Sequence, residues 1–323
     1  MINTSHQNTK SIPSEKQDYW RKYHSEAALE WGDALRKEYE IVSTGVKIHI
    51  DAYERPEPDA PVIQFNHGAG GYSRLFLPLA LALYDKGYTS IFPDQRGQGL
   101  SEGSRGDFTI GQFAENIVDV ATWASRKYAG NLFMAGGSLG GALTYYAAVA
   151  GAPVSAIICH NLYNFGDPRD SLAMSRLSFL NYLPGVPALL FNVIQRIAQV
   201  LPRLKIPFLL LGRFEKMVDA RAKGFYPLWR KDPYSIRTVS LRYIASTFST
   251  PPAIPFPKSP LPVLVINQSR DLMVAPAVTK RNYELLANPK QYVEIDYGHW
   301  AMGGTFEEEW SKIADDFLSQ YRK

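Results

Sequence analysis

The stretch that decides the fold is Met134-Ala135-Gly136-Gly137-Ser138-Leu139-Gly140-Gly141. It reads Gly-x-Ser-x-Gly, and it lies between an apolar run typical of a strand and a run of small residues typical of a helix. Glycines on both sides of Ser138 allow a tight turn and let the helix pack close to the strand. A serine hydroxyl is a weak nucleophile in water, and a strand–turn–helix context of this kind can expose it beside a base. Ser138 is therefore the candidate nucleophile, and its partners must come from elsewhere in the chain.

Strand and helix patterns alternate through most of the chain outside this turn. Apolar runs predict strands at 61–66, 89–94, 131–135, 155–160, 263–267 and 291–296, and amphipathic or small-residue runs predict helices at 75–84, 110–128, 139–150, 275–287 and 306–321. A hairpin is expected over residues 39–51. Repeated strand–helix units indicate an α/β fold with a mostly parallel, doubly wound sheet that is covered on both faces. Ligands of such sheets bind at the carboxyl ends of the strands.

Residues 161–257 interrupt the alternation and carry most of the positive charge. They hold 13 Lys and Arg against 5 Asp and Glu, a net charge of +8, while the rest of the chain carries −4. We therefore expect an N-terminal extension with a helix at 1–38, a core of residues 39–160 and 258–323, and a helical cap at 161–257. In the extension, a capping-box spacing at Ser14 predicts one helix. Its buried stripe would comprise Trp20, Tyr23, Ala27, Trp31 and Ala34.

Composition excludes several classes of protein. The net charge of +4 is too small to indicate a nucleic-acid partner. Cys159 is the single cysteine and lies in an apolar run, so we expect a buried thiol and no internal disulfide. The polar N-terminus and the absence of a long uninterrupted apolar stretch predict neither a signal peptide nor a membrane span. These features together predict a cytoplasmic protein.

Three polar residues follow three predicted strands in the order Ser, Asp, His. Ser138 follows the strand at 131–135, Asp271 follows 263–267, and His299 follows 291–296. Because parallel strands end at one edge of a sheet, we expect the three side chains to meet there. His299 would take the proton of Ser138, and Asp271 would fix the imidazole tautomer. Each residue alone also has a structural explanation (a tight turn, a loop cap, a packed histidine), so their coincidence carries the hypothesis.

Asp296 is the rival acid for this set. It lies three residues before His299 and within the predicted strand, so its side chain is not expected to align behind the imidazole ring.

A tetrahedral intermediate also needs hydrogen-bond donors for its oxyanion. Residues 66–71, Asn-His-Gly-Ala-Gly-Gly, follow a strand and expose backbone N–H groups. The N–H groups of Ala69 and Leu139 are the expected donors.

Three further residues are predicted to contact substrate: His67, Gly68 and His160, which ends a strand where the cap begins. His67 has two alternative roles, a second base or a hydrogen bond within its loop. The loop role is favoured because His299 has the better position.

These motifs resemble the α/β-hydrolase superfamily, most closely its branch of monoacylglycerol lipases, lysophospholipases and serine-aminopeptidase-type proteins. The similarity covers roughly residues 40–160 and 258–323. His67-Gly68-Ala69-Gly70 is similar to the oxyanion motif of this branch, and 94–103 is similar to its Asp-x-x-Gly-x-Gly-x-Ser-x-Gly loop, a structural turn. The resemblance implies Ser138, Asp271 and His299 as a catalytic triad, Ala69 and Leu139 as the oxyanion hole, a variable cap, and no metal or cofactor.

Two features depart from this branch. Gly137 precedes Ser138 where many of these lipases carry His. This resembles proline iminopeptidases, but their His-Gly-Gly-Pro-Gly differs from residues 67–70 here. The predicted helix at 14–38 also lies before the usual start of the family.

The predicted function is hydrolysis of a carboxylic ester through an acyl-enzyme, with a small acyl substrate of medium or long chain. An apolar cap with a basic rim suits such a chain and could contact an anionic membrane surface, or its apolar residues could simply pack on the core. The alternatives are an aminopeptidase or amidase, an acyl-lactone hydrolase, and a non-catalytic lipid-binding protein on this scaffold. An aminopeptidase would need acidic groups in the cap, which has few, and a non-catalytic protein commonly lacks a triad residue.

Overall fold

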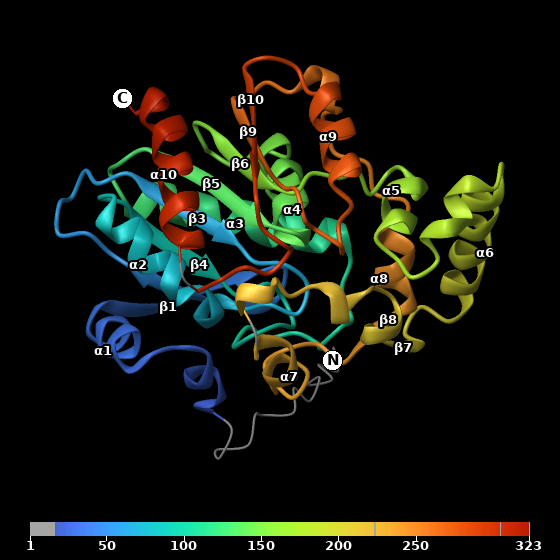
Figure 1. Ribbon diagram of the computed structural model, residues 1–323, viewed down its shortest axis with the longest axis horizontal. Coiled ribbons are helices and arrows are strands. Elements are labelled where there is room, and N and C mark those ends of the chain that lie inside the picture. The colour runs from blue at the N-terminus through green and yellow to red at the C-terminus, as the bar shows by residue number, and fades with distance from the viewer. Residues whose placement is uncertain (1–16, 223, 304, 323) are drawn as a thin grey trace, which may run out of the picture.

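The computed structural model describes residues 17–222, 224–303 and 305–322, and an eight-stranded sheet forms its centre (Figure 1). The strands follow the spatial order β1-β2-β4-β3-β5-β6-β9-β10. The β1–β2 and β2–β4 pairs are antiparallel, and all other pairs are parallel. The strands are β1 Arg36–Ser43, β2 Val46–Tyr53, β3 Val62–Asn66, β4 Thr89–Pro93, β5 Leu132–Gly137, β6 Ile157–His160, β9 Val263–Gln268 and β10 Lys290–Ile295. The predicted α/β class, the mostly parallel sheet and the hairpin are confirmed.

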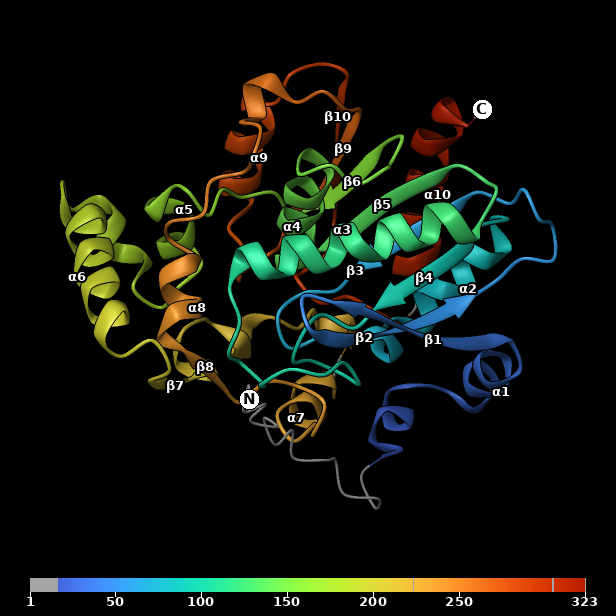
Figure 2. The same ribbon diagram turned by 180° about the vertical axis from the view of Figure 1, so that it is seen from behind.

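Helices cover both faces of this sheet. α2 and α10 pack together on the face seen in Figure 1, and α3 and α4 pack together on the opposite face, seen in Figure 2. Every residue of α4 is buried, which explains why its sequence is small and apolar instead of amphipathic. The helices of this part are α2 Leu77–Asp85, α3 Ile110–Lys127, α4 Leu139–Val149, α9 Pro276–Leu285 and α10 Phe306–Leu318, with the 3₁₀ turns η3 Ser73–Phe76, η8 Phe256–Lys258 and η9 Ser319–Tyr321.

The order of the strands places a crevice at the end of β3. The chain passes from β3 to β4 on one side and returns to β5 on the other side of β3. Loops after β3 and β5 therefore diverge at a switch point, where ligands bind in open parallel sheets. Ser138 follows β5, and the loop at 67–71 follows β3.

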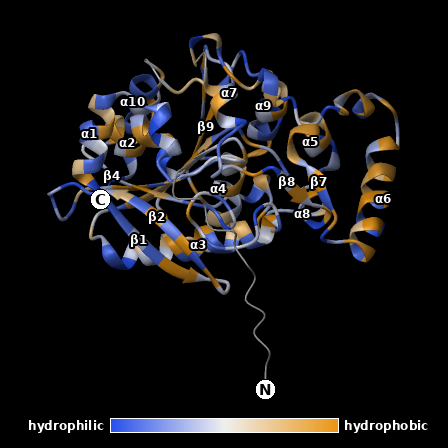
Figure 3. Ribbon diagram, turned by 90° about the horizontal axis from the view of Figure 1, so that it is seen from below, coloured by the Kyte–Doolittle hydropathy of each residue, from blue (hydrophilic) through white to orange (hydrophobic). Residues whose placement is uncertain are grey.

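Residues 161–257, hereafter the cap segment, form short helices and a separate two-stranded sheet. α6 packs against α8 and lies at the edge of the molecule, away from the large sheet (Figure 3). The elements are α5 Pro168–Ala173, α6 Val186–Val200, β7 Lys205–Pro207, α7 Phe225–Trp229, β8 Thr238–Ser240 and α8 Leu241–Ser246, with η4 Ser178–Tyr182, η5 Phe208–Leu210, η6 Phe214–Lys216 and η7 Ala220–Ala222. Among the described residues, no helix combines the length and apolarity needed to span a bilayer.

The prediction of one continuous helix in the N-terminal extension is wrong. Two short helices, η2 Tyr19–Tyr23 and α1 Glu26–Leu35, are separated by extended backbone. Ser25 begins α1 by accepting a hydrogen bond from the N–H of Ala28. The break resets the helical phase, so Ala27 and Ala34 of the predicted stripe are exposed, whereas Leu29 is buried. Ser14 lies outside the described residues.

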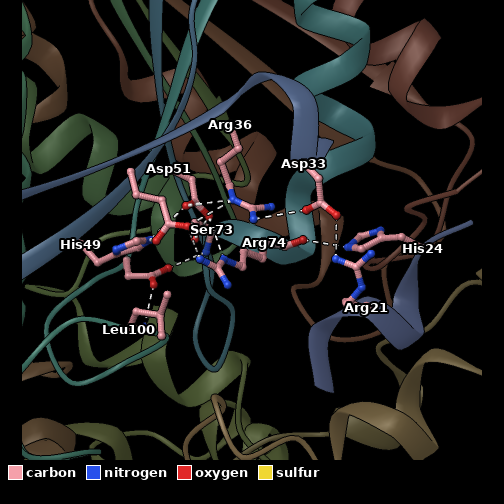
Figure 4. A network of polar contacts seen from close by, with 11 residues as sticks. Arg21, His24, Asp33, Arg36, His49, Asp51, Ser73, Arg74 and Leu100 are labelled. Carbon is pink, nitrogen blue, oxygen red and sulfur yellow. Dashed lines mark hydrogen bonds and ion pairs between the residues drawn. The ribbon is translucent and has the colours of Figure 1, made fainter. Parts of the chain in front are cut away.

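A charged network docks this extension on the core (Figure 4). Arg36 and Arg74 lie over the ring of Trp20, 5.0 and 5.1 Å from its centroid. The Nε2 of His24 donates a hydrogen bond to the carbonyl oxygen of Arg74 at 2.8 Å. The buried carboxylate of Asp51 faces the Nε atoms of Arg36 and Arg74 at 3.8 and 3.5 Å. Because a buried carboxylate needs such partners, the extension and the core stabilise each other.

Candidate active site

Ser138 occupies a strained turn between β5 and α4. Its backbone has φ 57° and ψ −122°, a combination that costs free energy for any residue with a Cβ atom. Two hydrogen bonds hold the turn: the Ser138 N–H donates to the carbonyl of His160 at 2.9 Å, and the Ser138 carbonyl accepts from Gly141 at 3.0 Å. A Cβ atom at Gly140 would overlap the carbonyl oxygen of Asn66, so glycine is required for α4 to approach the end of β3. The surrounding structure thus enforces the turn that places the half-buried Ser138 in the walls of two cavities.

Asp271 and His299 meet at the neighbouring strand ends. The Nδ1 of His299 lies 2.7 Å from the Oδ2 of Asp271, and both side chains are buried. The other carboxylate oxygen accepts hydrogen bonds from the N–H groups of Met273 and Val274, both at 2.8 Å. A carboxylate fixed in this way favours the tautomer protonated at Nδ1, which leaves Nε2 of His299 able to accept a proton.

Asp296 does not take part in this arrangement. Its side chain is 80% exposed, and it forms an ion pair with the Nε of Arg270 at 2.8 Å. The geometry therefore agrees with the sequence expectation that Asp296 would not align behind His299.

Ser138 and His299 line one narrow cavity of about 70 Å³, hereafter the inner cavity. Gly68 and His160, which are predicted to contact substrate, also line it. Most of the remaining wall is apolar and comes from the core and from the cap segment: Phe65, Phe76, Leu79, Met217, Phe225, Trp229, Trp300, Met302, Phe306 and Trp310. Among the residues that the structure describes, no Asp, Glu, Lys or Arg belongs to this wall.

Gly68 lies directly against the candidate nucleophile. A Cβ atom at this position would lie 3.0 Å from the Cβ of Ser138 and 3.2 Å from the carbonyl oxygen of Gly137. Glycine is therefore needed for the loop after β3 to approach Ser138.

Ala69 and Leu139 place two backbone N–H groups beside Ser138. All three residues line a second cavity, and Ala69 lines the inner cavity as well. Leu139 is the first residue of α4, where N–H groups have no acceptor within the helix. The Ala69 N–H donates no hydrogen bond within the described ranges. These two N–H groups can donate hydrogen bonds to a bound carbonyl oxygen as negative charge develops on it.

His67 corrects a prediction, because it lines neither cavity. Its Nε2 accepts a hydrogen bond from the N–H of Gln95 at 2.9 Å, so Nδ1 carries the proton and donates to the carbonyl of Gly68 at 2.8 Å. Burial lowers the pKa of His67 and keeps the ring neutral. His67 thus shapes the loop, which is the role favoured from the sequence.

His160 is a neutral wall of the inner cavity. Burial, together with the nearby His299, lowers the pKa of His160 to about 4. Its Nε2 is buried and has no hydrogen-bond partner among the described residues. The imidazole of His160 therefore adds a polar group without charge to the apolar wall.

The second cavity, hereafter the cap cavity, measures about 250 Å³ and lies between the core loops and the cap segment. Ser138 belongs to its wall too, so the hydroxyl stands at the junction of the two cavities. The sequence reasoning did not identify Tyr163 and Tyr243, which also line it. Tyr163 closely follows β6 at the edge that carries the other site residues, and this position was the available signal; Tyr243 lies on α8 and had none.

Asn161 is a further residue that was not identified from the sequence. It directly follows β6 with φ 72°, lines the inner cavity, and places its Nδ2 3.4 Å from the Oδ2 of Asp271. Asn161 therefore donates to the same carboxylate oxygen that His299 contacts.

One group of possible metal ligands exists within the described ranges: Glu38, His49 and Asp51. Figure 4 shows His49 and Asp51 in the charged network. Arg36 and Arg74 supply positive charge to both Asp51 and Glu38. We therefore interpret these three residues as part of an ion-pair network.

The parallel sheet, the serine turn after β5 and the Asp–His pair at adjacent strand ends define an α/β hydrolase. Residues 56–299 match the Hydrolase_4 family, described as serine aminopeptidase, S33, and the chain belongs to this family.

Several known proteins are similar to the chain. An uncharacterized 31.7 kDa Escherichia coli protein from the traX-finO intergenic region is 27% identical over 272 residues, covering 81% of this chain and 91% of that protein. The monoglyceride lipase of Rattus norvegicus is 27% identical over 234 residues, covering 58% of this chain and 76% of the lipase. A soluble variant of the Saccharomyces cerevisiae monoglyceride lipase has a TM-score of 0.70 at 16% identity, covering 90% and 96% of the two chains. At this identity the structural likeness concerns the fold alone.

Proposed function

We propose that the protein is a serine hydrolase that cleaves carboxylic esters through an acyl-enzyme. The observation that carries the proposal is the 2.7 Å contact of Asp271 with His299, which lines the same cavity as the strained Ser138. His299 takes the proton of Ser138 as its Oγ attacks the ester carbonyl, and the N–H groups of Ala69 and Leu139 stabilise the oxyanion. The alcohol leaves with a proton from His299, and water activated by His299 then releases the acid.

We place the two arms of the ester, the alcohol and the acyl group, in the two different cavities. Since His299 must return its proton to the leaving oxygen, the leaving group lies on the side that His299 lines, which is the inner cavity. The acyl arm then extends into the larger cap cavity, which His299 does not line. The inner cavity has about half the volume of a cavity known to hold benzene, which suits a short apolar alcohol better than a polyol.

An aminopeptidase activity is less well supported, although the matching family is described as serine aminopeptidase. A substrate amine needs an unpaired acidic group near the scissile bond, and within the described part of the chain no Asp or Glu lines either cavity. Each acidic residue of the cap segment already has a partner: Asp167 with Arg169, Asp170 with Arg281, Glu215 with Arg176, Asp219 with Arg221, and Asp232 with Tyr23 and Tyr72.

A panel of butyl esters from butanoate to palmitate, run beside alanyl and prolyl anilides, tests the proposal. We expect the released acid to show turnover of esters of medium or long acids and very slow turnover of the anilides. Glyceryl octanoate should react more slowly than butyl octanoate. Fast anilide cleavage would favour the amidase alternative, and fast cleavage of acyl lactones with inert linear esters would favour a lactonase. Binding of a fatty acid without turnover of any ester would indicate a non-catalytic protein.

We further propose that the cap segment contacts anionic membrane surfaces. Large apolar side chains on and around α6 are exposed: Leu177, Phe179, Tyr182, Leu183, Leu189, Val193, Ile197, Val200, Leu201 and Leu204. Arg196 and Arg203 lie among them in the sequence, and such apolar faces with basic neighbours bind anionic lipids. Flotation with anionic liposomes should carry the wild-type protein, and Val193→Asp should reduce the floating fraction. Absence of the wild-type protein from the liposomes at low salt would contradict this contact.

A further inference from the structure

Two tyrosine side chains, Tyr163 and Tyr243, line the cap cavity, and their residues are only 3% and 6% exposed. Among the described residues, no hydrogen bond involves the Tyr243 hydroxyl, and the one side-chain hydrogen bond that acts on Tyr163 comes from Ser138. Buried polar groups are nearly always paired, so an open phenol in the cavity beside Ser138 calls for a ligand.

The other polar side chains of this wall are already paired. The hydroxyl of Ser171 donates to the carbonyl of Thr247, and that of Ser175 donates to the carbonyl of Leu172. Arg176 forms an ion pair with Glu215 at 2.7 Å. The phenols are therefore the polar groups of the wall that remain free to receive a ligand beside Ser138.

The phenols are close to the reacting centre. Two neighbours of Tyr163 act on its pKa. Ser138 acts through a hydrogen bond, and Tyr243 acts through charge. Burial raises the pKa of both phenols, so both stay protonated and can donate. Beyond them the wall is aliphatic and aromatic, with Leu190, Ile194, Phe208, Leu210, Leu211 and Phe214.

We propose that Tyr163 and Tyr243 form a polar subsite for an oxygen atom on the acyl arm, close to the scissile carbonyl. The substrate class is then esters of 3-hydroxy or 3-oxo acids, whose alkyl remainder occupies the apolar part of the cap cavity. The inference rests on the proposed function, because it places the acyl arm in the cap cavity. A plain fatty acyl chain would leave the Tyr243 hydroxyl unpaired, and a site that pairs an oxygen discriminates against an analogue lacking it.

Three matched substrates test the subsite: butyl octanoate, butyl 3-hydroxyoctanoate as separate enantiomers, and butyl 7-hydroxyoctanoate. We expect kcat/KM for one 3-hydroxy enantiomer to exceed that for octanoate by about tenfold or more, with no gain for the 7-hydroxy ester. Tyr243→Phe should bring the ratio to about one, because kcat/KM for the 3-hydroxy ester loses the hydrogen bond that sets it apart. Tyr145→Phe is the matched control, because its buried hydroxyl donates to the carbonyl of Ile254 and lines neither cavity.

Several outcomes would overturn the subsite. One is an equal kcat/KM for octanoate and 3-hydroxyoctanoate in the wild type, and another is a preference that survives Tyr243→Phe. A uniform loss of kcat on all three esters in Tyr163→Phe, with the ratio unchanged, would make Tyr163 an oxyanion donor instead. Calorimetry on Ser138→Ala with octanoate and 3-hydroxyoctanoate measures the same preference without turnover. If no ester is cleaved but 3-hydroxyoctanoate binds more tightly, the proposed function fails and the subsite stands.

Discussion

The Nδ1 of His299 lies 2.7 Å from the Oδ2 of Asp271, although the two residues are 28 positions apart and follow different strands. The contact follows from the parallel pairing of β9 with β10, which brings their carboxyl ends side by side. Both side chains are buried, so little water competes for the hydrogen bond.

Replacing Asp271 by Asn should abolish most of the activity. An amide can donate to Nδ1 and so favours the wrong tautomer of His299, which lowers kcat about 10⁴-fold in comparable triads. The kcat for butyl octanoate measures the loss. Asp296→Asn is the matched control and should leave kcat unchanged, because Asp296 is exposed and pairs with Arg270. Wild-type kcat in Asp271→Asn would remove Asp271 from the proposed mechanism.

Gly68→Ala should reduce activity while the protein remains folded. The new Cβ atom would lie 3.0 Å from the Cβ of Ser138, so the loop or the serine must move by a few tenths of an ångström. Misplacement of a reacting group by about 1 Å can cost about 100-fold in rate, and we expect a loss of about tenfold or more in kcat/KM. Gly111→Ala is the control, since its Cβ atom meets only the Thr109 hydroxyl at 4.0 Å. Equal activities of the two variants would contradict the close approach.

Tyr23→Phe should destabilise the protein through the N-terminal extension. The Tyr23 hydroxyl donates at 2.7 Å to the carboxylate of Asp232, which is buried in the cap segment and also accepts from Tyr72. Removing one donor from a buried carboxylate should lower the free energy of unfolding by about 1–3 kcal/mol. Urea denaturation measures the change. Tyr182→Phe, at a side chain that is 87% exposed, should have no effect, and a similar null result for Tyr23→Phe would show that the extension does not support the cap segment.

Stability should fall in mild acid because of His24. Burial lowers the pKa of His24 to about 4 in the folded protein, against about 6.5 in the unfolded chain. Between these values the unfolded chain binds more protons, so stability declines as pH falls from about 6.5 to 4, by up to about 3 kcal/mol for this residue. Measured across this range, the melting temperature of the wild type should fall relative to that of His24→Gln as pH falls from about 7 to 4. Parallel curves would mean that His24 does not titrate as expected.

The parts of the site that follow parallel strands could be predicted from the sequence. Alternating strand and helix patterns fix which loops share an edge, and Ser138, Asp271 and His299 each lie in the loop or turn that follows a strand. The broken helix near Ser25 was missed because a two-residue interruption leaves almost no trace in the hydrophobic pattern but shifts every later side chain. His67 was assigned to the pocket because its loop is there; the direction of its ring depends on Gln95, which follows another strand.

Tyr243 could not be identified from the sequence, for a different reason. It lies on α8, and only the packing of the cap segment on the core brings it to the cavity that Ser138 and Tyr163 share. The cap segment has irregular short elements with no repeating pattern, so no local rule fixes where its side chains point.

Labelling with a fluorophosphonate probe tests the central claim most directly, because the probe reacts with an activated serine and needs no knowledge of the natural substrate. Wild-type protein and Ser171→Ala, which removes another hydroxyl of the cap cavity, should each take up one probe at Ser138. Ser138→Ala should take up none. Labelling that persists in Ser138→Ala, or a wild-type protein that the probe does not label, would contradict the account.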